Sequence, residues 1–97
     1  MAVRFHRRVQ HDLNQALDYY RLESAKLADE FFDLFIEATA IANNNPKHFH
    51  FDPSGLRRFN LKRFPYHFLY DENAKGIRIW VLRHNKRHPS YGLRRFK

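Results

Sequence analysis

The apolar positions in the first half of the chain repeat with the period of an α-helix. Positions 2–6 first alternate apolar with basic residues, a pattern typical of a brief strand. Over positions 8–22 the apolar residues then recur three or four places apart, which predicts an amphipathic helix. Ser24 is a suitable N-cap for a second helix, which ends at the asparagines before Pro46. Because the connection is so short, we expect the two helices to form an antiparallel hairpin.

The second half of the chain has the period of two that is typical of β-strands. It begins with a loop at positions 47–55, where Asp, Pro, Ser and Gly follow one another as in a turn. Three strands are predicted after this loop, at positions 56–63, 66–70 and 77–82, the last two joined by a polar hairpin loop at 71–76. Positions 83–97 are basic and contain Pro89 and Gly92, and we expect them to form one helical turn or to stay mobile.

These elements predict an α+β domain over residues 1–97, with a small, mostly antiparallel sheet in the order β-α-α-β-β-β and a basic C-terminal tail. The helical hairpin covers one face of the sheet. Strand alternation directs one set of side chains towards the helices: Phe59, Leu61, Tyr66, Phe68 and Tyr70. It directs a second set towards the other face: Arg58, Asn60, Lys62, His67 and Leu69. We expect this second face to be open and available for function.

Composition restricts the class of protein further. The 97 residues include no cysteine, which excludes disulfides, thiolate metal sites and thiol catalysis and is consistent with a reducing compartment. No stretch approaches the roughly 18 apolar residues of a membrane span, and the first residues have no apolar segment of the kind found in signal peptides. We therefore expect a cytoplasmic protein with no membrane partner.

The net charge of +8 belongs entirely to the second half of the chain. Before Asn45 there are 5 Lys and Arg against 7 Asp and Glu, whereas after it there are 13 against 3. Five of the seven histidines also lie in the second half. A cationic surface concentrates polyanions and speeds their capture, so nucleic acid and acidic protein segments are the expected partners.

Several short motifs, in their order and spacing, resemble one known family. In the helices they are Asp12-Leu13, Asp18-Tyr19-Tyr20, Leu27-Ala28-Asp29-Glu30-Phe31 and Asn45-Pro46. In the strands they are Leu56-Arg57-Arg58, Leu61-Lys62-Arg63-Phe64-Pro65-Tyr66, and Val81-Leu82-Arg83-His84-Asn85-Lys86-Arg87-His88-Pro89. With them the chain resembles the RelE/ParE superfamily of bacterial toxins from type II toxin–antitoxin pairs. The resemblance spans nearly the whole chain and implies a small antitoxin that wraps the toxin and neutralises its inhibition of growth.

The resemblance also implies one of two targets. RelE-like members cut messenger RNA on the translating ribosome without a metal or cofactor, whereas ParE-like members inhibit DNA gyrase. Matched by position to RelE-like nucleases, Lys62 and Arg87 would stabilise charge on the phosphate and Tyr91 would stack on a base. Histidines near neutral pH suit proton transfer, and the candidates are His67, His84 and His88. Asn60 and His67 stand where the family has a lysine and an arginine, which weakens this mechanism.

The residues leave three functions open. The cations that the chain retains favour ribosome-dependent RNA cleavage slightly, with inhibition of gyrase as the alternative and a non-toxic member that binds only antitoxin or nucleic acid as the third. The predicted contacts to nucleic acid or antitoxin are Arg57, Arg58, Arg63, Arg83, Lys86, Arg94 and Arg95. Simpler roles also stay open, because surface lysines and arginines protect strand edges and the Tyr91 ring can pack on the domain. The pattern does not decide which face of the sheet carries Trp80.

Overall fold

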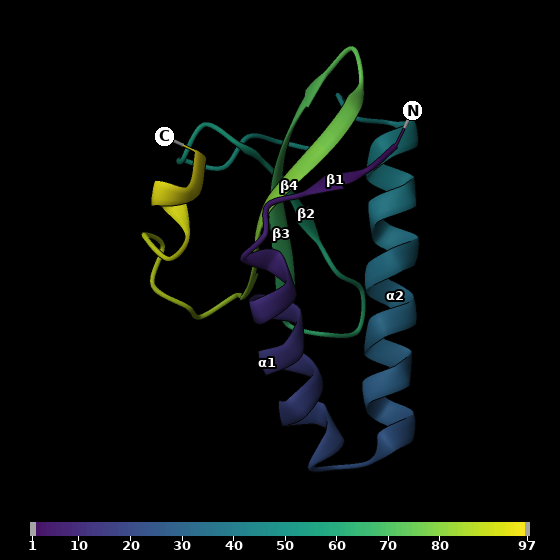
Figure 1. The fold of residues 1–97 in the computed structure, drawn as a ribbon. Helices are drawn as coiled ribbons and strands as arrows, with labels where there is room; N and C mark the ends of the chain where they lie inside the picture. The colour runs from purple at the N-terminus through teal and green to yellow at the C-terminus, as the bar shows by residue number, and fades with distance from the viewer. Residues whose placement is uncertain (1, 97) are drawn as a thin grey trace.

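The computed structural model describes residues 2–96, in which two helices pack on one face of a four-stranded sheet (Figure 1). The elements follow in the order β1 (Arg4–Phe5), α1 (Val9–Arg21), α2 (Ala25–Asn44), β2 (Arg57–Asn60), β3 (Tyr66–Asn73), β4 (Gly76–His84) and a 3-10 helix (Leu93–Phe96). This order confirms the predicted α+β fold and its β-α-α-β-β-β arrangement.

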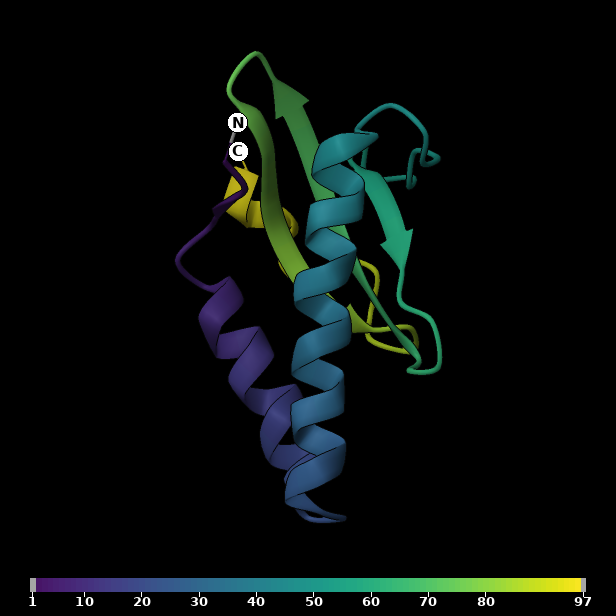
Figure 2. The same cartoon turned by 90° about the vertical axis from the view of Figure 1, so that its right-hand side faces the viewer.

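Local capping explains where the helical hairpin turns. The hydroxyl oxygen of Ser24 accepts a hydrogen bond from the backbone N–H of Leu27 at 3.0 Å, so α2 begins directly after the connection from α1. At the other end of α2 the side chain of Asn45 donates to the carbonyl of Ile41 at 3.1 Å, just before Pro46. Figure 2 shows the two helices side by side over the sheet, as their short connection predicts.

The sheet is mixed, because its short first strand runs parallel to its neighbour. The strand order is β1-β4-β3-β2, in which β1 pairs with β4 in parallel and the other pairs are antiparallel. Leu69 pairs with Val81 and Tyr70 pairs with Ile79, which leaves Trp80 as the extra residue of a β-bulge. The bulge places both Trp80 and Val81 on the face away from the helices.

Two predicted strand boundaries are wrong for local reasons. The strand predicted at positions 56–63 ends at Asn60, because Arg63 adopts a left-handed φ of 72° and the N–H of Phe64 donates to the carbonyl of Lys62 at 2.8 Å. The hairpin loop predicted at positions 71–76 is shorter than expected. Its first residues extend β3, and the chain reverses tightly before Gly76, whose φ is +117°.

The core between helices and sheet contains the side chains that alternation directs there. Phe59, Leu61, Tyr66, Phe68 and Tyr70 all join one cluster with the buried stripes of α1 and α2. Aromatic contacts dominate its centre: the rings of Phe59 and Phe68 stack at 5.0 Å, and that of Phe35 from α2 meets Phe68 edge-on at 5.9 Å. This part of the predicted fold is confirmed.

The opposite face of the sheet is covered rather than open, which corrects the expectation from the sequence. Leu56, Leu69 and Val81 form a second buried cluster there, under the tail residues Tyr91, Leu93 and Phe96. The tail, yellow in Figure 1, ends in a 3-10 turn, which is one of the two outcomes predicted for it. Burying three large apolar side chains, each worth about 1.5–3 kcal/mol, favours this docking. Only part of this face is left for function.

Candidate functional site

The basic tail is held to the domain by one buried carboxylate, Asp12 of α1. Its Oδ2 accepts from Nη1 of Arg95 at 2.6 Å and from the backbone N–H of Leu82 at 3.1 Å. Its Oδ1 accepts from the Tyr91 hydroxyl at 2.6 Å and from Nη2 of Arg95 at 3.0 Å. Arg95 also donates to the carbonyl of Trp80 at 3.0 Å. Asp12 and Arg95 thus provide hydrogen-bond partners for backbone groups of β4 that lie past its pairing with β1, and they tie the tail to this strand.

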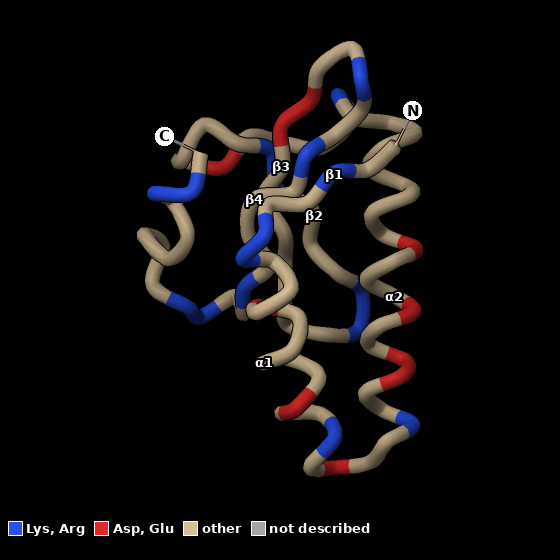
Figure 3. The backbone as a smooth tube through the Cα atoms, viewed as in Figure 1, with Lys and Arg blue, Asp and Glu red and all other residues tan. Residues whose placement is uncertain are grey.

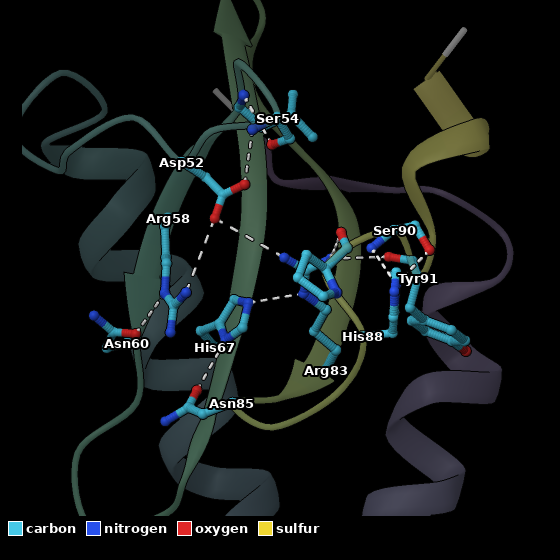
Figure 4. Close-up of polar contacts among 12 residues, drawn as sticks. Asp52, Ser54, Arg58, Asn60, His67, Arg83, Asn85, His88, Ser90 and Tyr91 are labelled. Atoms are coloured by element: carbon cyan, nitrogen blue, oxygen red, sulfur yellow. Dashed lines mark hydrogen bonds and ion pairs between the residues drawn. The ribbon is translucent and has the colours of Figure 1, made fainter.

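A second set of hydrogen bonds holds the tail from the sheet side (Figure 4). Arg83, which is buried in β4, donates through Nη1 to the carbonyls of Pro89 at 2.7 Å and Tyr91 at 3.0 Å. Its Nε donates to Nε2 of His67 at 2.9 Å. Because Nε2 accepts, the imidazole proton is on Nδ1, which donates to Oδ1 of Asn85 at 2.8 Å. His67 therefore orients Arg83, and both of its ring nitrogens are occupied.

Burial decides the charge state of this imidazole. It lowers the pKa of His67 to about 4, and the guanidiniums of Arg58 and Arg83 act in the same direction, while the hydrogen bond to Asn85 opposes them. His67 is consequently neutral near pH 7. Burial would raise the pKa of Asp52, but the hydrogen bonds from Ser54 and the nearby Arg83 and Arg58 hold it below its usual value. The carboxylate lies 3.9 Å from each of these two guanidiniums.

A basic cleft of about 460 Å³ lies between the tail and the loop at positions 52–54. Buried Arg83 and His67 line it, together with the more exposed Arg58, Arg87 and His88. Arg58 is fixed by donating from Nε to Oδ1 of Asn60 at 2.8 Å. Nδ1 of His88 lies 2.7 Å from the hydroxyl of Ser90. The basic cleft thus combines fixed cations with hydrogen-bonding groups, which suits an anionic ligand or partner.

A smaller aromatic hollow of about 210 Å³ lies on the other side of Arg87. Its lining includes Tyr19, Tyr66, His84, Arg87 and Tyr91. The guanidinium of Arg87 lies over the Tyr91 ring at 3.9 Å, and the rings of His84 and Tyr66 meet at 5.1 Å. Of the predicted catalytic set, the structure therefore brings together His84, Arg87 and Tyr91, with His88 and His67 in the adjacent basic cleft.

Lys62 lies apart from both hollows. Positioned beyond the end of β2, it lines a shallow groove against α2 with Leu34 and Ile41. The neighbouring Arg63 pairs with Glu30 of α2 at 2.9 Å. The alternation that directs Lys62 to the opposite face does not apply here, because the chain has already left the strand.

The remaining predicted contact residues divide into structural and exposed groups. Arg57 donates to the carbonyl of Phe49 at 2.9 Å, and Arg83 and Arg95 hold the tail. Lys86 and Arg94 are exposed on the tail side of the molecule. Figure 3 shows the segregation that results, with Lys and Arg concentrated on the sheet and tail and Asp and Glu spaced along α2. An acidic partner would meet the sheet and tail side.

Asp12, Asn85 and Asp52 are site residues that the sequence reasoning did not assign. A signal existed for Asp12, which is three positions after Val9 and one before Leu13 and so falls on the apolar stripe of α1. A carboxylate on a buried stripe needs a partner of opposite charge. No comparable pattern marks Asn85 or Asp52, because both are in loops.

The family of the chain follows from comparison with known proteins. A family model described as ParE toxin of type II toxin-antitoxin system, parDE, matches residues 3–89. The chain belongs to this ParE toxin family. The match takes in the helices, the sheet and the turn up to Pro89, whereas Tyr91 and Arg95 lie beyond it. No curated protein matches the sequence significantly.

Membership of the ParE toxin family implies a partner, the antitoxin of the pair. Within residues 2–96 no helix has the length and apolar character needed to cross a bilayer. The same residues contain no group of three or more His, Asp or Glu side chains placed to bind a metal ion.

Proposed function

We propose that the chain is a toxin that inhibits DNA gyrase by binding it through the basic cleft and the tail, without cleaving RNA. The resemblance to the superfamily links its ParE-like members with this target, and the family match is to ParE toxins. The observation that carries the proposal is the position of Lys62, which shares neither hollow with Arg87. The two cations assigned to the scissile phosphate in RelE-like nucleases therefore do not converge on one site.

Metal-free cleavage of RNA makes demands that His67 and Arg95 do not meet. The 2′-hydroxyl must lose a proton, the leaving oxygen must gain one, and cations must neutralise the phosphorane. His67 is neutral near pH 7 and has both ring nitrogens bonded, so it has no free nitrogen for a substrate. Arg95 is neutralised by Asp12.

Binding of a protein target does not require catalytic groups to converge on one point, and the exposed cations of the same surface support it. Arg58, Lys86, Arg87, His88 and Arg94 are at least partly exposed around the basic cleft and the tail. A rim of cations speeds the capture of an acidic protein surface and fixes its orientation. We propose that the antitoxin neutralises the toxin by covering these same cations.

Ribosome-dependent RNA cleavage is the second candidate, and one contact favours it. In the aromatic hollow, Arg87 stacks on Tyr91 beside His84, which places a cation, an aromatic ring and an imidazole together. A nucleotide could be held there by its phosphate and base. The two candidates differ in their dependence on Lys62, since binding through the basic cleft does not require it.

The test is induced expression without antitoxin, with growth and a DNA-damage reporter followed together. We expect the native chain and the Lys62→Ala variant to arrest growth and induce the reporter alike. The Arg58→Ala, Arg87→Ala double variant should bind its target at least about tenfold more weakly and lose both effects. Growth arrest without the reporter, abolished by Lys62→Ala, would instead support RNA cleavage. A folded native chain that leaves growth unchanged would overturn both candidates in favour of a non-toxic binder.

A further inference from the structure

Two arginines lie side by side on the sheet, away from the basic cleft. Arg4 of β1 and Arg78 of β4 are Cα partners in the parallel pairing of these strands. Phe5 contacts Phe35 on the helix side, and Ile79 is also buried there, so alternation directs both arginines to the other face. Figure 3 shows the basic segments of β1 and β4 next to each other. We call these two residues the Arg4–Arg78 patch.

Neither guanidinium of the pair has an acidic partner within residues 2–96. The Nε atoms of Arg4 and Arg78 are buried and make no hydrogen bond to any described residue. Asp71 faces Arg78 across β3 and β4 and its charge offsets part of that of Arg78, but the two form no ion pair, and Oδ1 of Asp71 accepts from the indole N–H of Trp80 at 2.9 Å. Like charges that face each other across neighbouring strands destabilise a sheet. Repulsion between the two arginines therefore destabilises the sheet, and a bound anion would reduce this repulsion.

The surroundings of the Arg4–Arg78 patch are also positive. Burial lowers the pKa of the adjacent His6, and Arg95, Arg78 and Arg7 lower it further, while Asp12 opposes them. Arg95 itself is paired with Asp12, and the exposed Arg7 lines a hollow on the helix side with Phe5 and Phe35. Two arginines without an ion pair among the described residues thus lie close together at the β1 edge of the sheet, next to His6.

We propose that the Arg4–Arg78 patch binds the phosphate backbone of nucleic acid. The patch offers charge without an apolar anchor: the guanidinium of Arg78 covers the Trp80 ring at 4.3 Å, and Phe96 packs against the same ring at 5.9 Å. Protein partners depend on buried aromatic or apolar anchors, whereas phosphate contacts alone supply most non-specific affinity for nucleic acid. The planar guanidinium fork is well matched to phosphate oxygens. The inference does not depend on gyrase being the target.

The experiment is fluorescence anisotropy of the full chain with a labelled duplex DNA and, in a second arm, a labelled single-stranded RNA. Affinity is measured between about 50 and about 200 mM salt. We expect Arg4→Gln, Arg78→Gln to weaken duplex binding about tenfold or more and to reduce the salt slope by about two, one unit for each phosphate that is no longer neutralised. If the double variant fails to fold, each single variant should reduce the slope by about one.

The matched control removes the same charge elsewhere. Lys26 and Lys47 are exposed and lie outside the patch, so Lys26→Gln, Lys47→Gln should retain most of the slope. If the control variant loses as much of the salt slope, the effect comes from net charge alone and the patch is not a specific site. A polyglutamate peptide serves as competitor. If it displaces the duplex at equal charge concentration, and only when both arginines are present, the ligand is an acidic protein segment and the proposal of nucleic acid is wrong.

Discussion

At the scale of single residues, two buried groups that titrate or carry charge decide how the tail is held. His67 is 1% exposed and Asp12 is 4% exposed, and each is fully engaged in hydrogen bonds. Both act through an arginine: His67 orients Arg83, and Asp12 holds Arg95. Changing either group therefore alters the tail as well as the core.

Protonation of His67 should destabilise the fold. Its pKa is about 4 in the folded chain against 6.5 when unfolded, so the unfolded state binds more protons between these values. Its contribution to stability is complete above about pH 6.5 and falls by up to about 3 kcal/mol as the pH drops to about 4. Urea unfolding across this range should show a shallower pH slope for His67→Gln. The exposed His48→Gln should behave as the native chain, and an unchanged slope in His67→Gln would count against the assignment.

Removing the charge of Asp12 should leave the Arg95 guanidinium buried without its partner. We expect Asp12→Asn to destabilise the chain by about 3 kcal/mol in urea unfolding. The matched control is Asp18→Asn, which breaks an ion pair with Arg21 whose two side chains are more than half exposed and should cost less than about 1 kcal/mol. Equal losses of unfolding free energy in the two variants would show that Asp12 does not stabilise a buried arginine.

Among the elements, the docking of the tail depends on the close approach of its backbone at Gly92 to the side chain of Val81 in β4. Gly92 has a φ of +81°, and a Cβ placed on it would lie 2.5 Å from Cγ2 of Val81. The 3-10 helix that follows carries Leu93 and Phe96 onto the cluster around Leu69. A side chain at position 92 would therefore lift the tail from the sheet.

The Gly92→Ala variant tests this docking. It should expose the tail to proteases and speed amide exchange at the residues beneath it, with a loss of about 1–3 kcal/mol in stability. Gly55→Ala is the matched control, since its φ is +92° but nothing lies within 4 Å of the added Cβ. It should show only the cost of backbone strain. Equal protection of the tail in the native chain and in Gly92→Ala would mean that the tail does not depend on this contact.

Periodicity predicted the helices and the central strands well and the tail poorly. The apolar stripes of α1 and α2 are long and regular, and Ser24 is a strong capping signal. In the tail, Tyr91, Leu93 and Phe96 follow no single period and alternate with cations, so no pattern indicated that they cover a sheet face. Lys62 was misplaced because the left-handed Arg63 ends the strand early, and a residue other than glycine in that conformation leaves no signal in the sequence.

Across the whole molecule, basic and acidic residues are separated. The acidic residues of α2 lie on one side, and basic segments of the sheet and tail lie on the other (Figure 3). The basic cleft and the Arg4–Arg78 patch belong to this second side. The sequence predicted the family from its motifs and the sign of this asymmetry from its composition. It could not predict which cations are exposed, because only the fold encloses Arg83 and Arg95 among their partners and leaves Arg87 at the surface.

If the cations around the basic cleft bind DNA gyrase, the chain should inhibit the supercoiling of a relaxed plasmid. Increasing amounts of the purified, antitoxin-free chain are added to gyrase, and the same preparation is added to a cell-free translation reaction whose message is mapped at its 5′ ends. We predict that supercoiling is inhibited, that the message stays intact, and that Arg58→Ala, Arg87→Ala restores supercoiling. Unimpeded supercoiling together with cuts that appear only on translated message would show that the chain cleaves RNA and does not act on gyrase.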